Sequence, residues 1–219
     1  MKLETAYESR PDFRSQLELL HQYGRNIAWG EKEKGYLSFV RELNRGEAKL
    51  RYLNRIEAEP MGYKEGILRE SNISCIYVFA RNKQFQLAEK MQLFSNGHIL
   101  PRGFKWVTEK SVFEETPEDT AYRGLKQELG LNIEEDDRPL SHELKRLRFR
   151  RKIIKDDSAN TYPGLQSRMT ASDFEIHLTD HEYETNKILL PTGELVHGFA
   201  EVQEDKTTYF AFLDTLENI

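Results

Sequence analysis

Residues 115–131 read ETPEDTAYRGLKQELGL, and this stretch is the most informative part of the chain for its fold. Thr116 is a favourable N-cap residue, and Pro117 suits the first position of a helix because its missing N–H would be unpaired there anyway. Gly130 follows the last apolar residue, as is typical of a helix end. An apolar stripe at a spacing of four lies between them: Ala121, Leu125 and Leu129. The stretch therefore predicts an amphipathic helix over 117–129.

The same stretch resembles the Nudix box, whose pattern is Gly, five residues, Glu, seven residues, then Arg-Glu-aliphatic-any-Glu-Glu-any-Gly-aliphatic. Glu115 matches the first glutamate, and seven residues separate it from Arg123. Further matches in register are Leu125, Glu128, Gly130 and Leu131. Upstream, residues 101–103 (Pro-Arg-Gly) resemble the entry to the loop of the box. The strand pattern around the box extends the resemblance to residues 70–219.

The resemblance implies a chemistry for these residues. In the family, carboxylates on one helix face hold divalent cations beside a pyrophosphate, and the arginine pairs with the first glutamate to brace the loop. It therefore implies catalytic roles for Glu128 and Glu115, with structural support from Arg123. Metal ligation falls to Glu128 and, weakly, to Gln127. The implied cofactor is Mg²⁺ or Mn²⁺, which bridges carboxylate and phosphate oxygens and positions the attacking water.

The chain departs from the box at three positions. Glu109 stands where the family has its glycine, Gly124 replaces the glutamate after the arginine, and Gln127 replaces the first of the paired glutamates. Loss of a general base is expected to lower the rate by ~100- to 10,000-fold. Carboxylates near the loop and the start of the helix, or from later strands and loops, are candidates to substitute for it: Glu109, Glu114, Glu118, Glu175 and Glu182.

Three functional hypotheses follow. The favoured one is a Nudix-fold protein with a degenerate catalytic box, which binds a nucleotide or diphosphate-containing ligand or a protein partner, with weak or no hydrolysis. The alternative is an active, metal-dependent Nudix hydrolase of nucleoside diphosphate-linked substrates that uses an atypical set of carboxylates. The third is an RNA-binding protein.

Two features outside the box are candidate ligand contacts. The segment 145–155, KRLRFRRKIIK, carries seven Lys or Arg residues. In a strand, Arg146, Arg148 and Arg150 would share one face, where guanidinium groups can bind nucleotide or RNA phosphates. The other interpretation is an exposed face paired with nearby acidic residues. Trp106 is expected either to stack on a ligand base or to pack against the helix.

Composition limits the remaining possibilities. The net charge of -5 gives no general attraction to nucleic acid or to anionic membranes. The mean hydropathy is -0.72, and no apolar run approaches the ~20 residues of a spanning helix, which argues against an integral membrane protein. The N-terminal sequence has no signal-like apolar core, so we expect a cytoplasmic protein. The single cysteine, Cys75, lies in an apolar run and is expected to be buried.

The rest of the chain predicts an α+β fold with a mixed sheet, and the resemblance implies a Nudix-like α/β/α sandwich. Residues 1–70 are expected to form a helical N-terminal extension, and residues 71–219 the Nudix-like domain. Predicted helices in the extension cover 13–23, 36–43 and 48–56. Predicted strands cover 73–79, 85–94, 104–108, 142–154, 172–178, 184–190, 194–202 and 207–213. The N-terminal helices offer a surface for a protein partner, and a homodimer is a further expectation.

Overall fold

The chain divides into two compact units in a computed structural model that describes residues 12–27, 29, 35–104, 106–112, 114–138, 140–141, 145–158 and 162–215. The first unit comprises residues 1–73, 110–116 and 153–171. The second comprises residues 74–109, 117–152 and 172–219. The predicted domain boundary at residue 70 stays a prediction.

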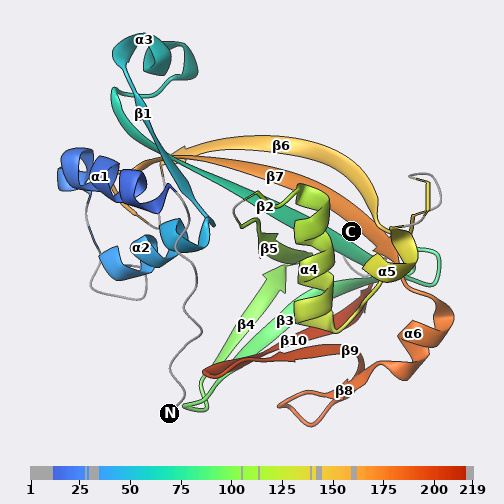
Figure 1. The fold of residues 1–219 in the computed structure, drawn as a ribbon. Coiled ribbons are helices and arrows are strands. Elements are labelled where there is room, and N and C mark those ends of the chain that lie inside the picture. Colours follow the sequence, from blue (N-terminus) through green and yellow to red (C-terminus); the bar gives the residue numbers. More distant parts are fainter. Residues whose placement is uncertain are drawn as a thin grey trace. The chain divides into compact units, whose positions relative to one another are not determined.

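Two of the predicted N-terminal helices are present in the first unit (Figure 1). Helix α1 spans Phe13–Tyr23 and continues into the short 3₁₀ helix η1 (Gly24–Asn26). Helix α2 spans Tyr36–Arg45 and ends at Gly46, whose φ of 73° is left-handed and whose N–H donates to the carbonyl oxygens of Glu42 and Leu43. Glycine is favoured there because it has no Cβ to clash in this conformation.

The third predicted helix, over residues 48–56, is wrong. After Gly46 the chain forms strand β1 (Lys49–Leu53), which pairs antiparallel with the first part of β2 (Gly66–Ala80). Leu50 and Leu53 are buried in the core from this strand. Only the end of the segment is helical, as α3 (Arg55–Ala58), followed by η2 (Glu59–Met61). Helix α3 begins at Asn54, whose side chain accepts the Glu57 N–H in a capping box, so the cap separates strand from helix.

The core of the first unit is aromatic and aliphatic. Tyr162 is fully buried, and its ring lies 4.8 Å from that of Phe39 and 6.0 Å from that of Trp29. The other buried members are Leu20, Ile27, Leu43, Ala48, Leu50, Ile67 and Leu165. Because α1, α2 and β1 all contribute, the two helices are stabilised by this packing and not by propensity alone.

The second unit contains most of the strands. They are β3 (Phe85–Phe94), β4 (Ile99–Phe104), β5 (Val107–Lys110), β6 (Arg148–Ser158), β7 (Gln166–His177), β8 (Lys187–Leu189), β9 (Leu195–Val202) and β10 (Lys206–Asp214), of which β5, β6 and β7 also reach into the first unit. The sheet order is β6-β7-β2-β3-β10-β9-β8, with β4 beside β3 and β5 beside β2. The predicted α+β class with a helical N-terminal portion is confirmed.

Some predicted strand limits are wrong. The segment 184–190 begins as the end of helix α6 (Asp180–Thr185), and only Lys187–Leu189 is a strand. The Thr179 side chain accepts the Glu182 N–H and the Glu182 side chain accepts the Thr179 N–H, so a capping box starts a helix that the alternation does not reveal. Strand β6 begins at Arg148 instead of residue 142.

The helix predicted over 117–129 is confirmed as α4 (Pro117–Leu129). Its buried face packs on both the sheet and the segment that follows the helix. The core cluster consists of Ile76, Val78, Leu87, Val107, Ala121, Tyr122, Leu125, Leu129, Leu131, Ile133, Leu147, Phe174, Ile176, Leu178, Phe199 and Phe210. Ser74 Oγ donates to Pro117 O at 2.7 Å, which fixes the start of α4 to β2. Gly130 ends the helix with a φ of 68°.

A buried carboxylate anchors the chain between α5 (Glu134–Asp137) and β6. Asp137 is fully buried and accepts the backbone N–H groups of Arg146 and Leu147, both at 3.0 Å. Its other donor is the hydroxyl group of Tyr122 on α4, at 3.2 Å. These bonds satisfy a charge that would otherwise be costly to bury.

Two expectations from composition can be compared with the structure. No helix within the described ranges is long and apolar enough to cross a membrane. Cys75 is buried on β2, as its apolar surroundings predict.

Candidate functional site

A cavity of about 440 Å³ lies at the C-terminal end of α4, within the second unit. Helix α4 contacts β9, and the end of α6 and strand β8 complete the wall. The residues that line it are Gln127, Glu128, Leu129, Gly130, Thr185, Asn186, Lys187, Ile188, Gly198, Phe199, Ala200, Glu201 and Val202. Two of the predicted site residues, Gln127 and Glu128, are thus brought together at one cavity.

Glu128 is half-buried, and its carboxyl group is strongly perturbed. Burial raises its pKa to about 8, helped by the negative charges of Glu201, Glu109 and Glu89, while Lys206 acts in the opposite direction. These groups come from β9, β5, β3 and β10, so the sheet concentrates carboxylates around the last turn of α4. At pH 7 the Glu128 side chain is therefore predominantly protonated and can donate a hydrogen bond.

The neighbouring carboxylates already have partners. Glu89 accepts from Arg102 Nε at 3.1 Å, and Glu201 accepts from Gln203. Glu109 forms a close ion pair with Arg123. Oxygen donors of this kind suit Mg²⁺ or Mn²⁺. However, no group of three or more Asp, Glu, His or Cys residues in the described part of the chain is arranged to hold a metal ion. The residues as they stand therefore do not fit the divalent ion that the Nudix resemblance implies.

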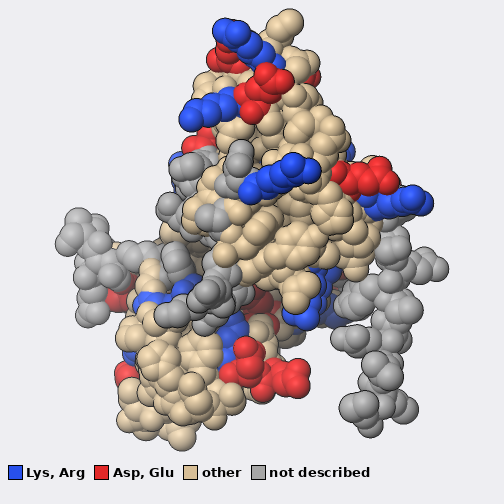
Figure 2. All heavy atoms as spheres, turned by 90° about the vertical axis from the view of Figure 1, so that its left-hand side faces the viewer, with Lys and Arg blue, Asp and Glu red and all other residues tan. Residues whose placement is uncertain are grey.

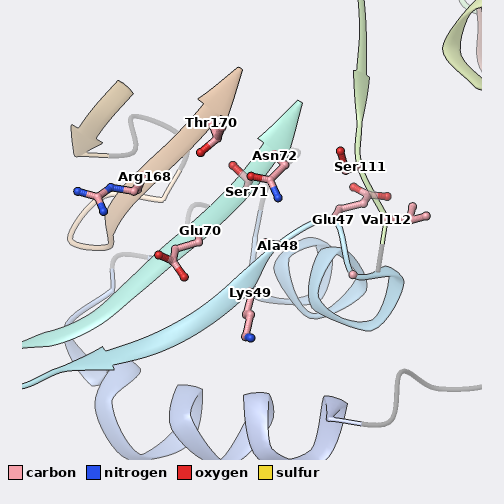
Figure 3. Close-up of a pocket in the computed structure, with 11 residues that line it drawn as sticks. Glu47, Ala48, Lys49, Glu70, Ser71, Asn72, Ser111, Val112, Arg168 and Thr170 are labelled. Atoms are coloured by element: carbon pink, nitrogen blue, oxygen red, sulfur yellow. The ribbon is translucent and has the colours of Figure 1, made fainter. Parts of the chain in front are cut away.

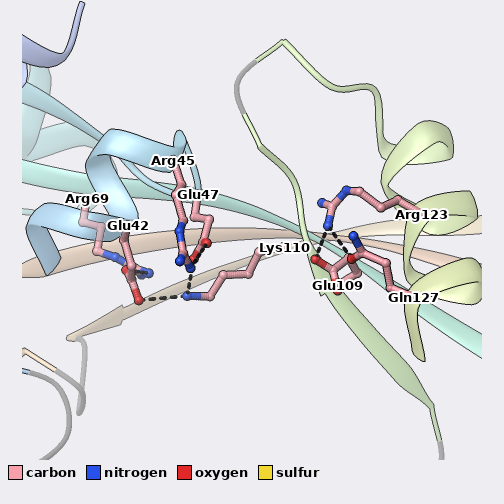
Figure 4. A network of polar contacts seen from close by, with 8 residues as sticks. All are labelled: Glu42, Arg45, Glu47, Arg69, Glu109, Lys110, Arg123 and Gln127. Atoms are coloured by element: carbon pink, nitrogen blue, oxygen red, sulfur yellow. Dashed lines mark hydrogen bonds and ion pairs between the residues drawn. The ribbon is translucent and has the colours of Figure 1, made fainter. Parts of the chain in front are cut away.

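Arg123 binds two side chains of the site (Figure 4). Its Nη1 donates to Glu109 and to Gln127 Oε1, the latter at 3.2 Å. The predicted partner, Glu115, belongs to the other unit, where its carboxylate accepts the Val112 N–H at 3.1 Å. The pairing of Glu115 with Arg123 stays a prediction.

Gly124 lies directly against Glu109. A Cβ atom at position 124 would come within 2.9 Å of Glu109 Cβ, 3.4 Å of Glu109 Cγ and 3.3 Å of Ile76 Cδ1. Carbon–carbon contacts as short as 2.9 Å are not tolerated without a shift of one partner. Position 109 has glutamate where the Nudix pattern has glycine, and position 124 has glycine where the pattern has glutamate. These two positions are therefore in direct contact.

Three other substitute carboxylates proposed from the sequence, Glu118, Glu175 and Glu182, do not line this cavity. Glu118 accepts from Tyr122 and Lys145 at the start of α4, and Glu182 accepts from Arg146. Glu175 pairs with Lys83 and with Arg150. Glu114 is an exposed residue of the first unit with a left-handed φ of 63°.

The basic segment is largely paired with acidic groups of the second unit. Arg146, which precedes β6, binds Glu182 Oε2 at 2.6 Å, and Arg151 Nε binds Asp173 at 2.7 Å. Arg150 Nε lies 3.5 Å from Glu175. Arg148 is exposed at the start of β6. The prediction that Arg146, Arg148 and Arg150 share one strand face is wrong for Arg146, because the strand begins only at residue 148.

Trp106 and Arg150 converge on Tyr77 of β2. The Trp106 ring lies 5.8 Å from the Tyr77 ring, and the Arg150 guanidinium carbon lies 5.1 Å above the same ring. In the sequence, nothing marks Tyr77 beyond its place in an apolar strand. Tyr77 and Trp106 are half-buried, and the Arg150 side chain is 44% exposed. We call Tyr77, Trp106 and Arg150 the aromatic–arginine surface.

The first unit has a polar network and a cavity of its own. Glu42, which is buried, binds Arg69 at 2.9 Å and Lys110 at 2.8 Å, and Lys110 also reaches Glu47 (Figure 4). Burial would raise the pKa of Glu42, but the charges of Lys110 and Arg69 outweigh it and lower that pKa overall. The cavity, of about 340 Å³, is lined by Gly46, Glu47, Ala48, Lys49, Glu70, Ser71, Asn72, Ser111, Val112, Arg168 and Thr170 (Figure 3).

The surface shows no single dominant charge on the face drawn in Figure 2. Lys and Arg side chains of the described residues lie there interspersed with Asp and Glu side chains. Such a pattern provides little long-range attraction for a polyanion.

No protein-family model matches the chain, and no curated protein matches it. Among solved structures, 66 chains match. One is the dihydroneopterin triphosphate pyrophosphohydrolase of E. coli, with 18% identity, a TM-score of 0.38, and coverage of 67% of this chain and 82% of that chain. Another is an Ap4A hydrolase of C. elegans, with 9% identity, a TM-score of 0.32, and coverage of 67% and 82%. A third is the Nudix domain of Shewanella oneidensis NrtR complexed with ADP ribose, with 9% identity, a TM-score of 0.35, and coverage of 75% and 86%. These three are Nudix proteins, the family that residues 115–131 resemble.

Proposed function

We propose that this protein binds a nucleotide-like, diphosphate-containing ligand and hydrolyses it weakly or not at all. The convergence of Trp106 and Arg150 on Tyr77 carries the proposal for binding. Aromatic rings and a guanidinium plane are the groups on which nucleobases stack, and each stacked base contributes about 1–3 kcal/mol.

Charge around this surface suits an anionic ligand. On β6, Arg148 and Lys152 are exposed and add positive charge beyond the ion pairs that Arg150 and Arg151 form with Glu175 and Asp173 on β7. The positive excess favours phosphate, and a guanidinium group binds phosphate oxygens with directed hydrogen bonds. The cavity beside Glu128, in contrast, has Lys187 and Glu201 among its lining residues, so its walls carry no excess of positive charge for a diphosphate.

The state of the box supports weak turnover. Gly124 offers no proton acceptor, and Gln127 adds no charge. Without a bound cation, burial and neighbouring carboxylates raise the pKa of Glu128 to about 8, so at pH 7 a metal ion has to displace the proton of this group. A protonated carboxyl group is a poor metal ligand and a poor general base.

Equilibrium titration with ADP-ribose as the probe, followed by calorimetry, tests the binding. Tyr77→Leu removes the ring and is expected to weaken binding by roughly 5- to 150-fold. Arg150→Gln tests the guanidinium group, and Arg55→Gln, at an exposed ion pair on α3, is the matched control. Unchanged affinity in both Tyr77→Leu and Arg150→Gln, or no binding by the folded wild-type protein, would refute the proposal.

The alternative function is active metal-dependent hydrolysis. It predicts turnover of dinucleotides, nucleotide sugars or capped RNA with Mg²⁺ or Mn²⁺ that Glu128→Gln abolishes. Turnover that grows as the pH rises through about 8 would support it, because metal binding requires the deprotonated carboxylate.

RNA binding is a third candidate, and it predicts affinity that falls steeply with salt concentration. The pairing of Arg146 and Arg151 with acidic side chains weakens this candidate, because those guanidinium groups are already engaged within the protein. A protein partner at the N-terminal helices, a homodimer and a cytoplasmic location remain expectations from the sequence.

A further inference from the structure

The contact between positions 109 and 124 links two departures from the Nudix pattern that lie apart in the sequence. The pattern has glycine at the first position and glutamate at the second, whereas this chain has Glu109 on β5 and Gly124 on α4. A glycine inside a helix is unfavourable by roughly 1 kcal/mol relative to alanine, so its presence calls for a steric reason. The 2.9 Å approach of a Cβ at 124 to Glu109 Cβ supplies that reason.

We propose that Glu109 and Gly124 are a matched exchange, in which the site carboxylate has moved from helix α4 to strand β5 while remaining at the same place in space. Glu109 is then the positioning residue that holds Arg123 and, through it, Gln127. The inference concerns helix α4, on which the proposed weak turnover rests, and not the aromatic–arginine surface proposed to bind the ligand; its evidence and its test involve no ligand.

Three observations support this assignment. The stem of Glu109 occupies the space over Gly124, because a Cβ at position 124 would lie 2.9 Å from Glu109 Cβ and 3.4 Å from Glu109 Cγ. Its carboxylate binds Arg123, which in turn binds Gln127, so the carboxylate faces the side of α4 on which the pattern places its acids (Figure 4). Its charge also acts on Glu128, one turn further along the helix.

The exchange can be tested by whether Gly124→Ala lowers or raises the melting temperature. The substitution is made in the wild-type chain and in the Glu109→Gly and Glu109→Ala variants. In the wild-type chain, Gly124→Ala brings two Cβ atoms together and is expected to lower the melting temperature by roughly 2 to 12 °C. In the Glu109→Gly background both contacts with Glu109 are gone, and only the 3.3 Å contact with Ile76 Cδ1, the end of a flexible side chain, remains. The same substitution is then expected to raise the melting temperature by up to about 2 to 4 °C. Glu109→Ala is the matched control, because it keeps the Cβ and so keeps the clash.

A second measurement separates positioning from packing. Glu109→Gln keeps the volume but removes the charge, and it is expected to shift the guanidinium ¹⁵N–¹H signals of Arg123 toward those of a free arginine with little change in melting temperature. The exchanged variant, Glu109→Gly with Gly124→Glu, restores a carboxylate beside Arg123 and is expected to return the signals toward the wild-type position.

Each result either supports or overturns the inference. An effect of Gly124→Ala that is the same in the wild-type, Glu109→Gly and Glu109→Ala backgrounds would overturn it. Arg123 signals that do not respond to Glu109→Gln would overturn the positioning role. Since neither result depends on nucleotide binding, a failure of the proposed function leaves this test unaffected.

Discussion

Replacing Glu128 by glutamine is expected to stabilise the protein at neutral and alkaline pH. The carboxyl group has a pKa of about 8 in the folded chain, against 4.5 for the ordinary value. Because the folded state holds the proton more tightly, the contribution of this group to stability is complete below pH 4.5 and is lost as the pH rises toward 8. Glutamine resembles the protonated form and cannot be deprotonated, so Glu128→Gln removes this loss.

The magnitude follows from the shift. At pH 7, about 2.5 pKa units separate the pH from the ordinary value, which corresponds to about 3 kcal/mol. For a chain of this length that is roughly 6 to 12 °C in melting temperature. The gain is expected to vanish near pH ~4 and to approach about 5 kcal/mol above pH ~8.

Urea unfolding of wild type and Glu128→Gln between about pH 4 and pH 9 measures this dependence. Glu204→Gln, at an exposed carboxylate in the turn before β10, is the matched control and is expected to leave the pH profile unchanged. Stability curves of wild type and Glu128→Gln that run parallel across this range would show that burial and repulsion do not perturb Glu128.

Three further outcomes are expected from the same unfolding assay. Gly198→Ala places a Cβ 2.0 Å from a carbonyl oxygen of β10 and should reduce stability by more than about 3 kcal/mol, whereas Gly103→Ala, with nothing within 4 Å, should be nearly neutral. Asp137→Ala leaves two backbone N–H groups without their acceptor and removes one of the two acceptors of the Tyr122 hydroxyl group, and it should cost about 3–5 kcal/mol; a loss below about 1 kcal/mol would contradict the anchoring role. Because the pKa of Glu42 is lowered in the folded chain, its ionised carboxylate contributes to the free energy of unfolding above pH 4.5, and this contribution is lost as the pH falls further. Glu42→Gln should therefore make the free energy of unfolding depend less on pH in that acid range.

Local sequence signals are enough to predict a helix or strand where tertiary packing favours the same structure. Helix α4 is predictable because its N-cap, its proline, its apolar stripe and its closing glycine all lie within residues 116–130. The structure of segment 48–56 is not predictable in this way, because the spacing of its apolar residues fits a helix as well as a strand. Pairing with residues 66–70 of β2, which no local pattern encodes, selects the strand.

The candidate site also has features that the sequence predicts and features that only tertiary packing sets. Residue type and helical spacing are enough to place Glu128, Arg123 and Gln127 on one helix, and to show that Gly124 and Gln127 weaken the resemblance to a metal-binding box. Tertiary packing was needed to place Glu109 over Gly124 and to bring Trp106 and Arg150 to Tyr77. Those contacts join residues on different strands and helices, and the sheet register that sets them is decided by packing across the whole unit rather than by neighbouring residues.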